Sequence, residues 1–364
     1  MRFFICGICM TVVSVIGFDH SFELAAAEPI TLENVTDPGP NSPDEPIAEE
    51  FSLERAVRFM DAAALTWQKE RRCFTCHTNY AYLMVRPAVS ADVLAHQQVR
   101  AFAEELVSKR WAEQGPRWDA EVVATAAALA LNDRATGGKL HPLTRQALDR
   151  MWTVQRGNGS WKWLDCDWPP MEDDDDYGVI LAAIATAAAP EDYAGTEAAQ
   201  AGMNKIRKYL SSHEPPTLHH RAMLVWADSY GAELLSQAER DACVAELFAV
   251  QHEDGGWSLP SLGDWKRPDG SEQSTGERDG YGTGFAMFVL RRAGIPAADP
   301  RLARGAGWLR SHQRASGRWF TRSLKKDNRH YISHVATAFA VLALSEMGEA
   351  TDKRKQPATE TGGE

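Results

Sequence analysis

The chain has 364 residues, with 39 basic and 50 acidic side chains, and its formal net charge at pH 7 is −11. This length suits one large or two ordinary domains with a buried core, and the 44% hydrophobic and 24% charged composition excludes a disordered or fibrous protein. The acidic balance argues against binding a nucleic acid, because contact with a phosphate backbone needs clustered Lys and Arg.

The first 27 residues are typical of a secretory signal peptide. Arg2 gives the positive start, residues 3–18 form an apolar core of 16 residues, and residues 25–27 are three alanines at a candidate cleavage site. No segment reaches the roughly 18–20 apolar residues that span a bilayer, which excludes an integral membrane protein. We therefore expect an exported protein, periplasmic or secreted, with a short uncleaved membrane anchor as the alternative.

Residues 28–50 contain five prolines and seven acidic residues, with few large apolar side chains. This composition predicts a flexible acidic linker, and the polar residues 351–364 predict a disordered tail. The folded body is expected at 53–348. It holds only four cysteines, which is too few for a disulfide scaffold in an exported chain of this size.

Three copies of a Q-x-x-x-G-x-W pattern recur in this body. Each copy follows an amphipathic helical pattern and precedes a more apolar, Ala-rich helical stretch. The Gly allows the chain to reverse, and the Trp provides a large flat anchor between neighbouring units. The three copies are Gln155, Gly159 and Trp161; Gln251, Gly255 and Trp257; and Gln313, Gly317 and Trp319.

A degenerate fourth copy begins at Gln68, and two further helix pairs, at about 97–131 and 196–230, lack the pattern. The total is six helix pairs, and no region shows the sustained period-two alternation of a strand. We therefore predict an all-α protein that forms a single α/α toroid, with apolar helices inside and amphipathic helices outside.

The Q-x-x-x-G-x-W copies resemble the QW repeats of the squalene–hopene cyclase and oxidosqualene cyclase superfamily, which is related to the β-subunit of protein prenyltransferases. The resemblance covers most of the body and implies a terpenoid-cyclase toroid that takes an apolar isoprenoid or another small molecule, with peripheral membrane association as an option. Two departures stand out. The squalene cyclases carry two barrels and act at the cytoplasmic face of the membrane, whereas this chain has the length for one barrel and is expected to be exported.

An acidic run, Asp173–Asp176, is followed by Tyr177 and opens an apolar helix. It is similar to the D-x-D-D-T-A motif of the squalene–hopene cyclases, in which the middle Asp protonates the terminal alkene of the polyene. By this resemblance Asp175 is the acid, Asp173 and Asp176 support it, and Tyr177 stands where the family has Thr. Clustered carboxyls suit this chemistry because their repulsion raises one pKa. A solvated acidic loop or a cation site is the alternative.

Residues Cys73, Cys76 and His77 form a C-x-x-C-H motif, the attachment signature for c-type haem. In this interpretation the two cysteines form thioethers with haem and His77 is the proximal iron ligand. Export agrees with it, because covalent haem attachment is expected outside the cytoplasm. The second axial ligand is not identified; Met84, which is close in sequence, and His330 or His334 are candidates. A zinc site, a disulfide between the two cysteines, and buried thiols remain as alternatives.

His330 and His334 are four residues apart on one helix face, where they can hold one metal ion or form a hydrogen-bonded helix start. Other polar residues begin the inner helices of successive units, and a closed ring brings such positions to one mouth of the barrel. Ordinary helix N-caps would also explain several of them. The residues expected at this cavity mouth are Asp119, His220, Asp279, Tyr281, Thr283 and Tyr331.

The leading hypothesis is an exported squalene–hopene-cyclase-like protein that binds an apolar isoprenoid, with cyclisation by protonation from Asp175 as its candidate activity. A haem c redox or sensor protein on a toroid scaffold is the second hypothesis, and a non-catalytic toroid that binds a ligand or partner is the third. A polysaccharide lyase or hydrolase is a fourth, by analogy of fold alone. Motifs for nucleotide binding, serine hydrolysis and zincin proteolysis are absent from the sequence.

Overall fold

The computed structural model describes residues 28–74, 77–325 and 331–349. This part of the chain is helical and has no β-strand, only isolated bridges such as the one between Ile47 and Arg314. The predicted signal peptide and tail, together with Cys76 and His330, lie outside the described residues. Within the described ranges, no helix combines the length and the hydropathy that a membrane span requires.

Six inner helices form a closed ring, in which each helix packs against the next and the last packs against the first. These helices are apolar on nearly every face, and in the shortest of them all seven residues are buried. A helix that is apolar on every side lies inside a core. The inner helices are α2 (Asn79–Val85), α5 (Asp119–Thr136), α7 (Asp175–Ala188), α9 (Leu218–Asp228), α11 (Gly280–Arg292) and α13 (Ile332–Glu346).

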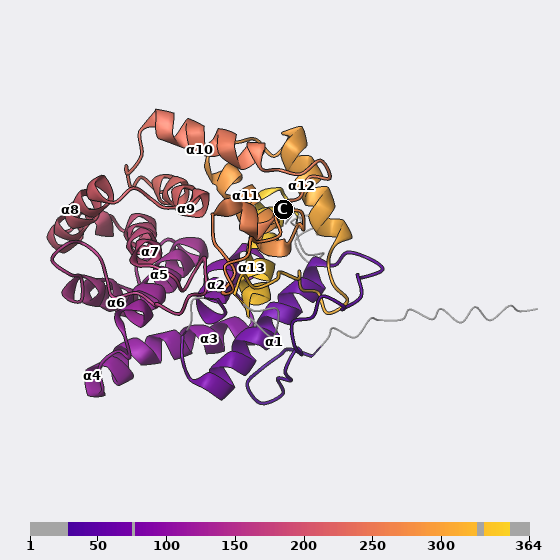
Figure 1. Cartoon of the computed structure of the whole chain (residues 1–364). Helices are drawn as coiled ribbons and strands as arrows, with labels where there is room; N and C mark the ends of the chain where they lie inside the picture. The colour runs from indigo at the N-terminus through magenta and orange to yellow at the C-terminus, as the bar shows by residue number, and fades with distance from the viewer. Residues whose placement is uncertain (1–27, 75–76, 326–330, 350–364) are drawn as a thin grey trace, which may run out of the picture.

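Amphipathic outer helices surround this ring (Figure 1). They are α1 (Leu53–Arg71), α3 (Leu94–Glu105), α6 (Pro142–Thr153), α8 (Glu197–Ser212), α10 (Gln237–Ala249) and α12 (Pro300–Ser311). Short helical segments lie between them: η1 (Arg86–Ala88), η2 (Leu106–Arg110), α4 (Trp111–Glu113), η3 (Tyr193–Gly195) and η4 (Leu259–Leu262). Each outer helix precedes an inner one, so the described residues form six helix pairs and the predicted all-α toroid is confirmed.

The three Q-x-x-x-G-x-W copies have the same geometry. Each Trp is fully buried, and its indole N–H donates to a main-chain oxygen of the preceding outer helix. Each Gln donates to the Gly of its own copy and to the backbone at or beside the next outer helix, which joins neighbouring units. The indole bonds are Trp161 to Met151 (3.0 Å), Trp257 to Leu247 (2.7 Å) and Trp319 to Leu309 (2.8 Å).

The glycine of each copy is required by its backbone. Gly159, Gly255 and Gly317 have φ angles of +99°, +96° and +96°, in the region that side chains with a Cβ rarely adopt. A Cβ added to any of the three would lie 2.4–2.5 Å from the backbone of the next outer helix. The spacing of the sequence pattern therefore reflects one close approach that is repeated around the ring.

Residues 28–50 differ from the expected flexible linker, because they lie against the toroid as an ordered segment, here called the N-terminal strap. The buried Arg318 side chain is the main cause. It donates to the carbonyl oxygens of residues 38–40 and forms an ion pair with Glu45 at 3.1 Å. The N–H of Ala48 donates to the carbonyl of Gln313 at 2.8 Å. A proline-rich acidic segment is thus ordered when groups of the toroid form hydrogen bonds with its main-chain N–H and carbonyl groups.

Candidate functional site

Polar side chains from the starts of the inner helices meet at one mouth of the barrel. Four direct contacts connect neighbouring helix starts. The first joins the loop before α7 to His77, which lies just before α2. The others join α7 to α9, α9 to α11, and the start of α13 to the start of α2. The register argument from the repeats therefore placed these helix starts at the same end. The linking contacts are His77 to Glu172 (3.4 Å), His220 to Asp174 (3.2 Å), His219 to Tyr281 (2.8 Å) and Thr78 to His334 (3.1 Å).

Asp174 is the N-cap of α7, and its carboxylate accepts the N–H of Tyr177 at 3.0 Å. The same carboxylate accepts a hydrogen bond from Nε2 of the fully buried His220, whose Nδ1 is 2.8 Å from the Thr217 hydroxyl. Burial alone would raise the pKa of Asp174, but His220 and the helix-start N–H groups outweigh it and hold that pKa below its ordinary value. The partners of Asp174 therefore favour its ionised form.

Asp175, the residue that the sequence resemblance marks as the acid, faces another set of partners. Its carboxylate forms an ion pair with Arg156 at 2.9 Å and accepts the N–H of Trp163 at 2.9 Å. The Ser160 hydroxyl lies 3.4 Å from the same group. These contacts tie the start of α7 to the turn of the first Q-x-x-x-G-x-W copy, which is a structural task.

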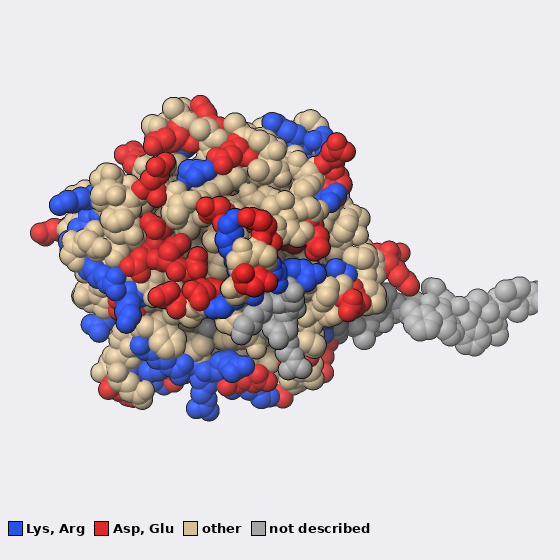
Figure 2. Space-filling model, in the orientation of Figure 1, with Lys and Arg blue, Asp and Glu red and all other residues tan. Residues whose placement is uncertain are grey.

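Asp173 and Asp176 flank these two residues and have raised pKa values. In both cases burial is the larger cause, and the negative charge of Asp174 adds to it. Asp176 lies toward Tyr209 and His213 of the outer ring, whereas Asp173 lies among Asp174, His220 and the loop at residues 165–167. Figure 2 shows acidic side chains gathered on this face, left of centre, over α7.

The interior beyond the acidic run is aromatic. His219 is fully buried, and its ring lies 4.4 Å from the Phe285 ring and 6.2 Å from the Tyr177 ring, stacked on both. Its Nε2 is 2.8 Å from the Tyr281 hydroxyl, and burial holds the pKa of His219 well below its ordinary value. A neutral imidazole and a phenol thus share a hydrogen bond in the centre of the ring.

Three of the expected mouth residues have structural roles at helix starts. Asp279 caps α11 by accepting the N–H groups of Gly282 and Leu259, and burial raises its pKa to about 6. Thr283 accepts the N–H of Trp257 at 2.9 Å, and Asp119, at the start of α5, accepts the N–H of Lys162 at 3.1 Å. The N-cap alternative explains these positions well.

Cys73 and His77, the described members of the C-x-x-C-H motif, lie between α1 and α2 at this mouth. The His77 side chain is 7% exposed, and its ring contacts Trp67 at 5.3 Å and Tyr331 at 5.6 Å. Cys73 carries a free thiol whose pKa is raised by burial. His334 is placed on the neighbouring helix, with Nδ1 3.1 Å from the Thr78 hydroxyl. Among the described residues, no three His, Cys, Asp or Glu side chains are grouped closely enough to hold a metal ion.

Sequence reasoning missed several members of this mouth. Glu172 contacts His77, Trp163 packs against Tyr177 at 5.5 Å, and Trp67 forms the wall beside the C-x-x-C-H segment. Glu172 directly precedes the acidic run, so the sequence could have indicated it as a further residue of this mouth. Trp67 and Trp163 lie outside the repeat pattern, and nothing in the sequence indicated them.

No family model matches this sequence, and no curated protein matches it. Solved structures do resemble its fold. The ent-copalyl diphosphate synthase from Streptomyces platensis aligns with a TM-score of 0.50 and 15% identity over 74% of this chain, which spans 50% of that protein's length. The type II terpene cyclase MstE from Scytonema, in its apo form, aligns with a TM-score of 0.50 and 13% identity over 81% of this chain and 98% of its own.

A polysaccharide lyase aligns with a TM-score of 0.49 and 10% identity over 81% of this chain and 96% of its own. At such identities a likeness shows architecture, and the site must be argued from its own residues. The chain has the α/α-toroid fold found in terpene cyclases.

Proposed function

We propose that this protein binds an apolar isoprenoid at the acidic mouth of the toroid and starts its cyclisation by protonating an alkene. One observation carries the proposal: the neighbouring carboxyls Asp173 and Asp174 have pKa values displaced in opposite directions. Two carboxyls whose surroundings push their pKa values apart are the usual mark of an acid and its supporting charge. The fold shared with terpene cyclases supports the same reading.

In this proposal Asp173 is the proton donor. Asp174 stays ionised through His220 and the start of α7, and its negative charge helps Asp173 to keep a proton. Asp175 is occupied by Arg156 and by the Trp163 N–H, so its role here is to hold the turn. The proton donor is thereby assigned two residues earlier than the Asp175 that the squalene–hopene cyclase resemblance implies, and His220 becomes a positioning residue.

The reaction balances without a cofactor. The Asp173 carboxyl gives its proton to one carbon of a terminal alkene, whose π electrons form the new C–H bond and leave a carbocation. The next alkene of the chain attacks the cationic carbon, which is the neighbour of the protonated one, and closes a ring. The new carbocation that this leaves loses a proton to water or to a carboxylate, which ends the sequence. The rings of Tyr177, Tyr281 and Phe285 lie beyond the acid, where aromatic faces stabilise positive charge.

The test is incubation of the purified protein with squalene or a shorter linear isoprenoid, followed by mass spectrometry for a product of unchanged mass and shifted retention. Asp173→Asn should lower the rate by roughly 10²–10⁴, the usual contribution of a general acid. Asp241→Asn, which changes an exposed carboxylate on the outer helix α10, is the control and should keep the rate. If Asp173→Asn keeps the rate while its folded state is unchanged, Asp173 is not the acid.

The C-x-x-C-H segment supports a second candidate function, a haem c protein exported before attachment. The observation in its favour is that the free Cys73 thiol and the His77 ring lie together beside Trp67, at the edge of the same mouth. Cys73 and Cys76 would hold the porphyrin and His77 would bind its iron, which would supply one-electron chemistry. His334 lies close to Tyr331 and Thr78 on the adjoining helix start, which makes it the described candidate for a second axial ligand.

An absorption spectrum and an intact mass of protein from an export-competent host with haem-attachment machinery test this candidate. A Soret band and a mass increase of one haem support it, and Cys73→Ser should remove both. Cys166→Ser, which changes an exposed thiol outside the motif, is the control. A colourless protein that contains stoichiometric zinc would indicate a zinc site in place of haem. A protein that contains neither haem nor zinc would indicate a structural role for the segment.

A further inference from the structure

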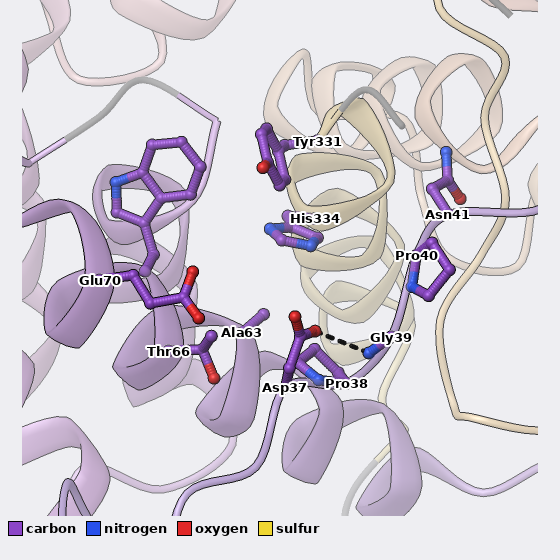
Figure 3. Close-up of a pocket in the computed structure, with 11 residues that line it drawn as sticks. Asp37, Pro38, Gly39, Pro40, Asn41, Ala63, Thr66, Glu70, Tyr331 and His334 are labelled. Atoms are coloured by element: carbon purple, nitrogen blue, oxygen red, sulfur yellow. Dashed lines mark hydrogen bonds between the residues drawn. The ribbon is translucent and has the colours of Figure 1, made fainter. Parts of the chain in front are cut away.

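A partly open cavity of about 310 Å³ lies beside the mouth, between the N-terminal strap, α1 and the start of α13. Its walls come from strap residues 37–41, from α1 residues such as Trp67 and Glu70, and from Tyr331 and His334 (Figure 3). The volume is at the lower end of the range for small-molecule sites. The acid mechanism does not use this cavity, and the haem candidate shares with it the wall residues Trp67, Tyr331 and His334.

The charge around the cavity is negative. Asp37 and Glu70 line it, and no Lys or Arg is among the described residues of its walls. In Figure 3 both carboxylates and the His334 ring turn toward the same space, each from a different segment of the chain. One Asp37 oxygen accepts the N–H of Gly39 at 2.8 Å, which fixes the carboxylate, and Glu70 forms no ion pair within the described residues. Such a site favours a cation.

Two aromatic rings form a corner of the same cavity. The Trp67 and Tyr331 rings are 4.7 Å apart at an interplanar angle of 81°, and the His334 ring is 5.4 Å from Tyr331. Perpendicular aromatic faces surround an organic cation from two sides, and the quadrupole of each ring attracts its charge. The Arg71 guanidinium lies 5.6 Å from the Trp67 centroid and donates to the Tyr331 hydroxyl at 3.4 Å, so it borders this corner, although Arg71 is not part of the cavity wall.

The strap completes the site by covering it. Arg318 holds the carbonyl oxygens of residues 38–40, and this contact places Asp37 and the prolines over the aromatic corner. A hard metal ion is a poor occupant, because no group of three His, Cys, Asp or Glu among the described residues converges on one point. The walls of the cavity therefore suit a compact ligand that has a positive charge and an apolar surface.

We propose that this cavity binds a small organic cation, of the alkylammonium class, between the Trp67–Tyr331 corner and the carboxylates of Asp37 and Glu70. The aromatic faces contact the apolar groups around the nitrogen, and the two carboxylates at the opening neutralise its charge. The site is separate from the acidic run at Asp173–Asp176 and does not rest on the function proposed above.

Calorimetric titration of the full-length protein with choline and with its neutral isostere 3,3-dimethylbutan-1-ol tests this site. Choline should bind saturably at one site, and the isostere, which has carbon in place of the charged nitrogen, should bind about tenfold more weakly or not at all. Glu70→Gln should weaken choline binding several-fold, and Asp37→Asn combined with it should weaken binding further. Glu54→Gln, an exposed change in the first turn of the same helix, should leave it unchanged.

Two results would overturn the proposal. Equal binding of the isostere would show an apolar pocket without preference for charge, and an absence of saturable choline binding at millimolar concentration would show no site. Because Asp37 and Glu70 are exposed, the substitutions should leave the folded state intact, which a thermal unfolding curve checks. A Trp67→Phe variant separates the ring contribution, since Phe keeps an aromatic face with weaker attraction for cations and should bind choline less tightly.

Discussion

Gln313 and Ser52 exchange two hydrogen bonds across the closure of the ring, although they are 261 residues apart in the sequence. The Gln313 side-chain amide donates to the Ser52 carbonyl oxygen, and the Ser52 N–H donates to the Gln313 side-chain oxygen, both at 2.8 Å. Ser52 is also the N-cap of α1, where its hydroxyl accepts the N–H of Arg55 at 3.1 Å. The last repeat is thereby fastened to the first helix.

Replacing Gln313 by Ala should destabilise the protein by about 2–4 kcal/mol, because it leaves a buried N–H and two carbonyls without their donor or acceptor. Urea unfolding followed by circular dichroism measures this loss. Gln237→Ala, which removes an exposed side chain from α10, is the control and should change stability by less than about 0.5 kcal/mol. A loss at Gln313 as small as the control's would show that the closure contributes little.

Gly255 and Gly307 offer a matched pair of substitutions. Gly255→Ala should destabilise by about 2–4 kcal/mol, because φ is +96° and the new Cβ would meet the Arg304 backbone at 2.5 Å. Gly307→Ala lies in α12 with open space around it, and it should stabilise by about 0.5–1 kcal/mol through helix propensity. Thermal unfolding of both variants compares the two, and a neutral Gly255→Ala would contradict the shared repeat geometry.

Much of this fold was predictable because its signals are local. The Gln, Gly and Trp of each copy lie within seven residues, and their hydrogen bonds reach only the helices on either side. One pattern was therefore enough to predict the order of the outer and inner helices. The strap was not predictable, since its order depends on Arg318, about 280 residues away. The sequence indicated the acidic run but not the separate roles of its carboxyls, because these depend on contacts with Arg156, Trp163 and His220, which come from other elements.

Asp279 should give the protein a measurable pH dependence of stability. Burial raises its pKa to about 6 from an ordinary 3.8, so the folded state binds this proton more tightly than the unfolded state. The stability that the protonated form contributes is therefore complete below about pH 4 and is lost as the pH rises through 6. At 1.36 kcal/mol per pKa unit the loss is about 3 kcal/mol.

Asp279→Asn isolates this effect, because Asn still accepts the N–H groups at the start of α11 but does not titrate. Between pH 4 and pH 7, the wild type should lose about 2–3 kcal/mol more unfolding free energy than this variant loses. Urea titrations at the two pH values provide it. A difference that is constant, or that grows with pH, would mean that the four donors around the carboxylate outweigh its burial.

The central claim, that Asp173 delivers a proton to an isoprenoid, is tested most directly by running the reaction in deuterium oxide. The carboxyl proton exchanges with solvent, so each cyclised product molecule should carry one deuterium more than product made in ordinary water, as mass spectrometry reads directly. Asp173→Asn should form at least about a hundredfold less of this product, while Asp241→Asn should match the wild type. A cyclised product without solvent deuterium, or one that Asp173→Asn still forms and Asp175→Asn does not, would contradict the account.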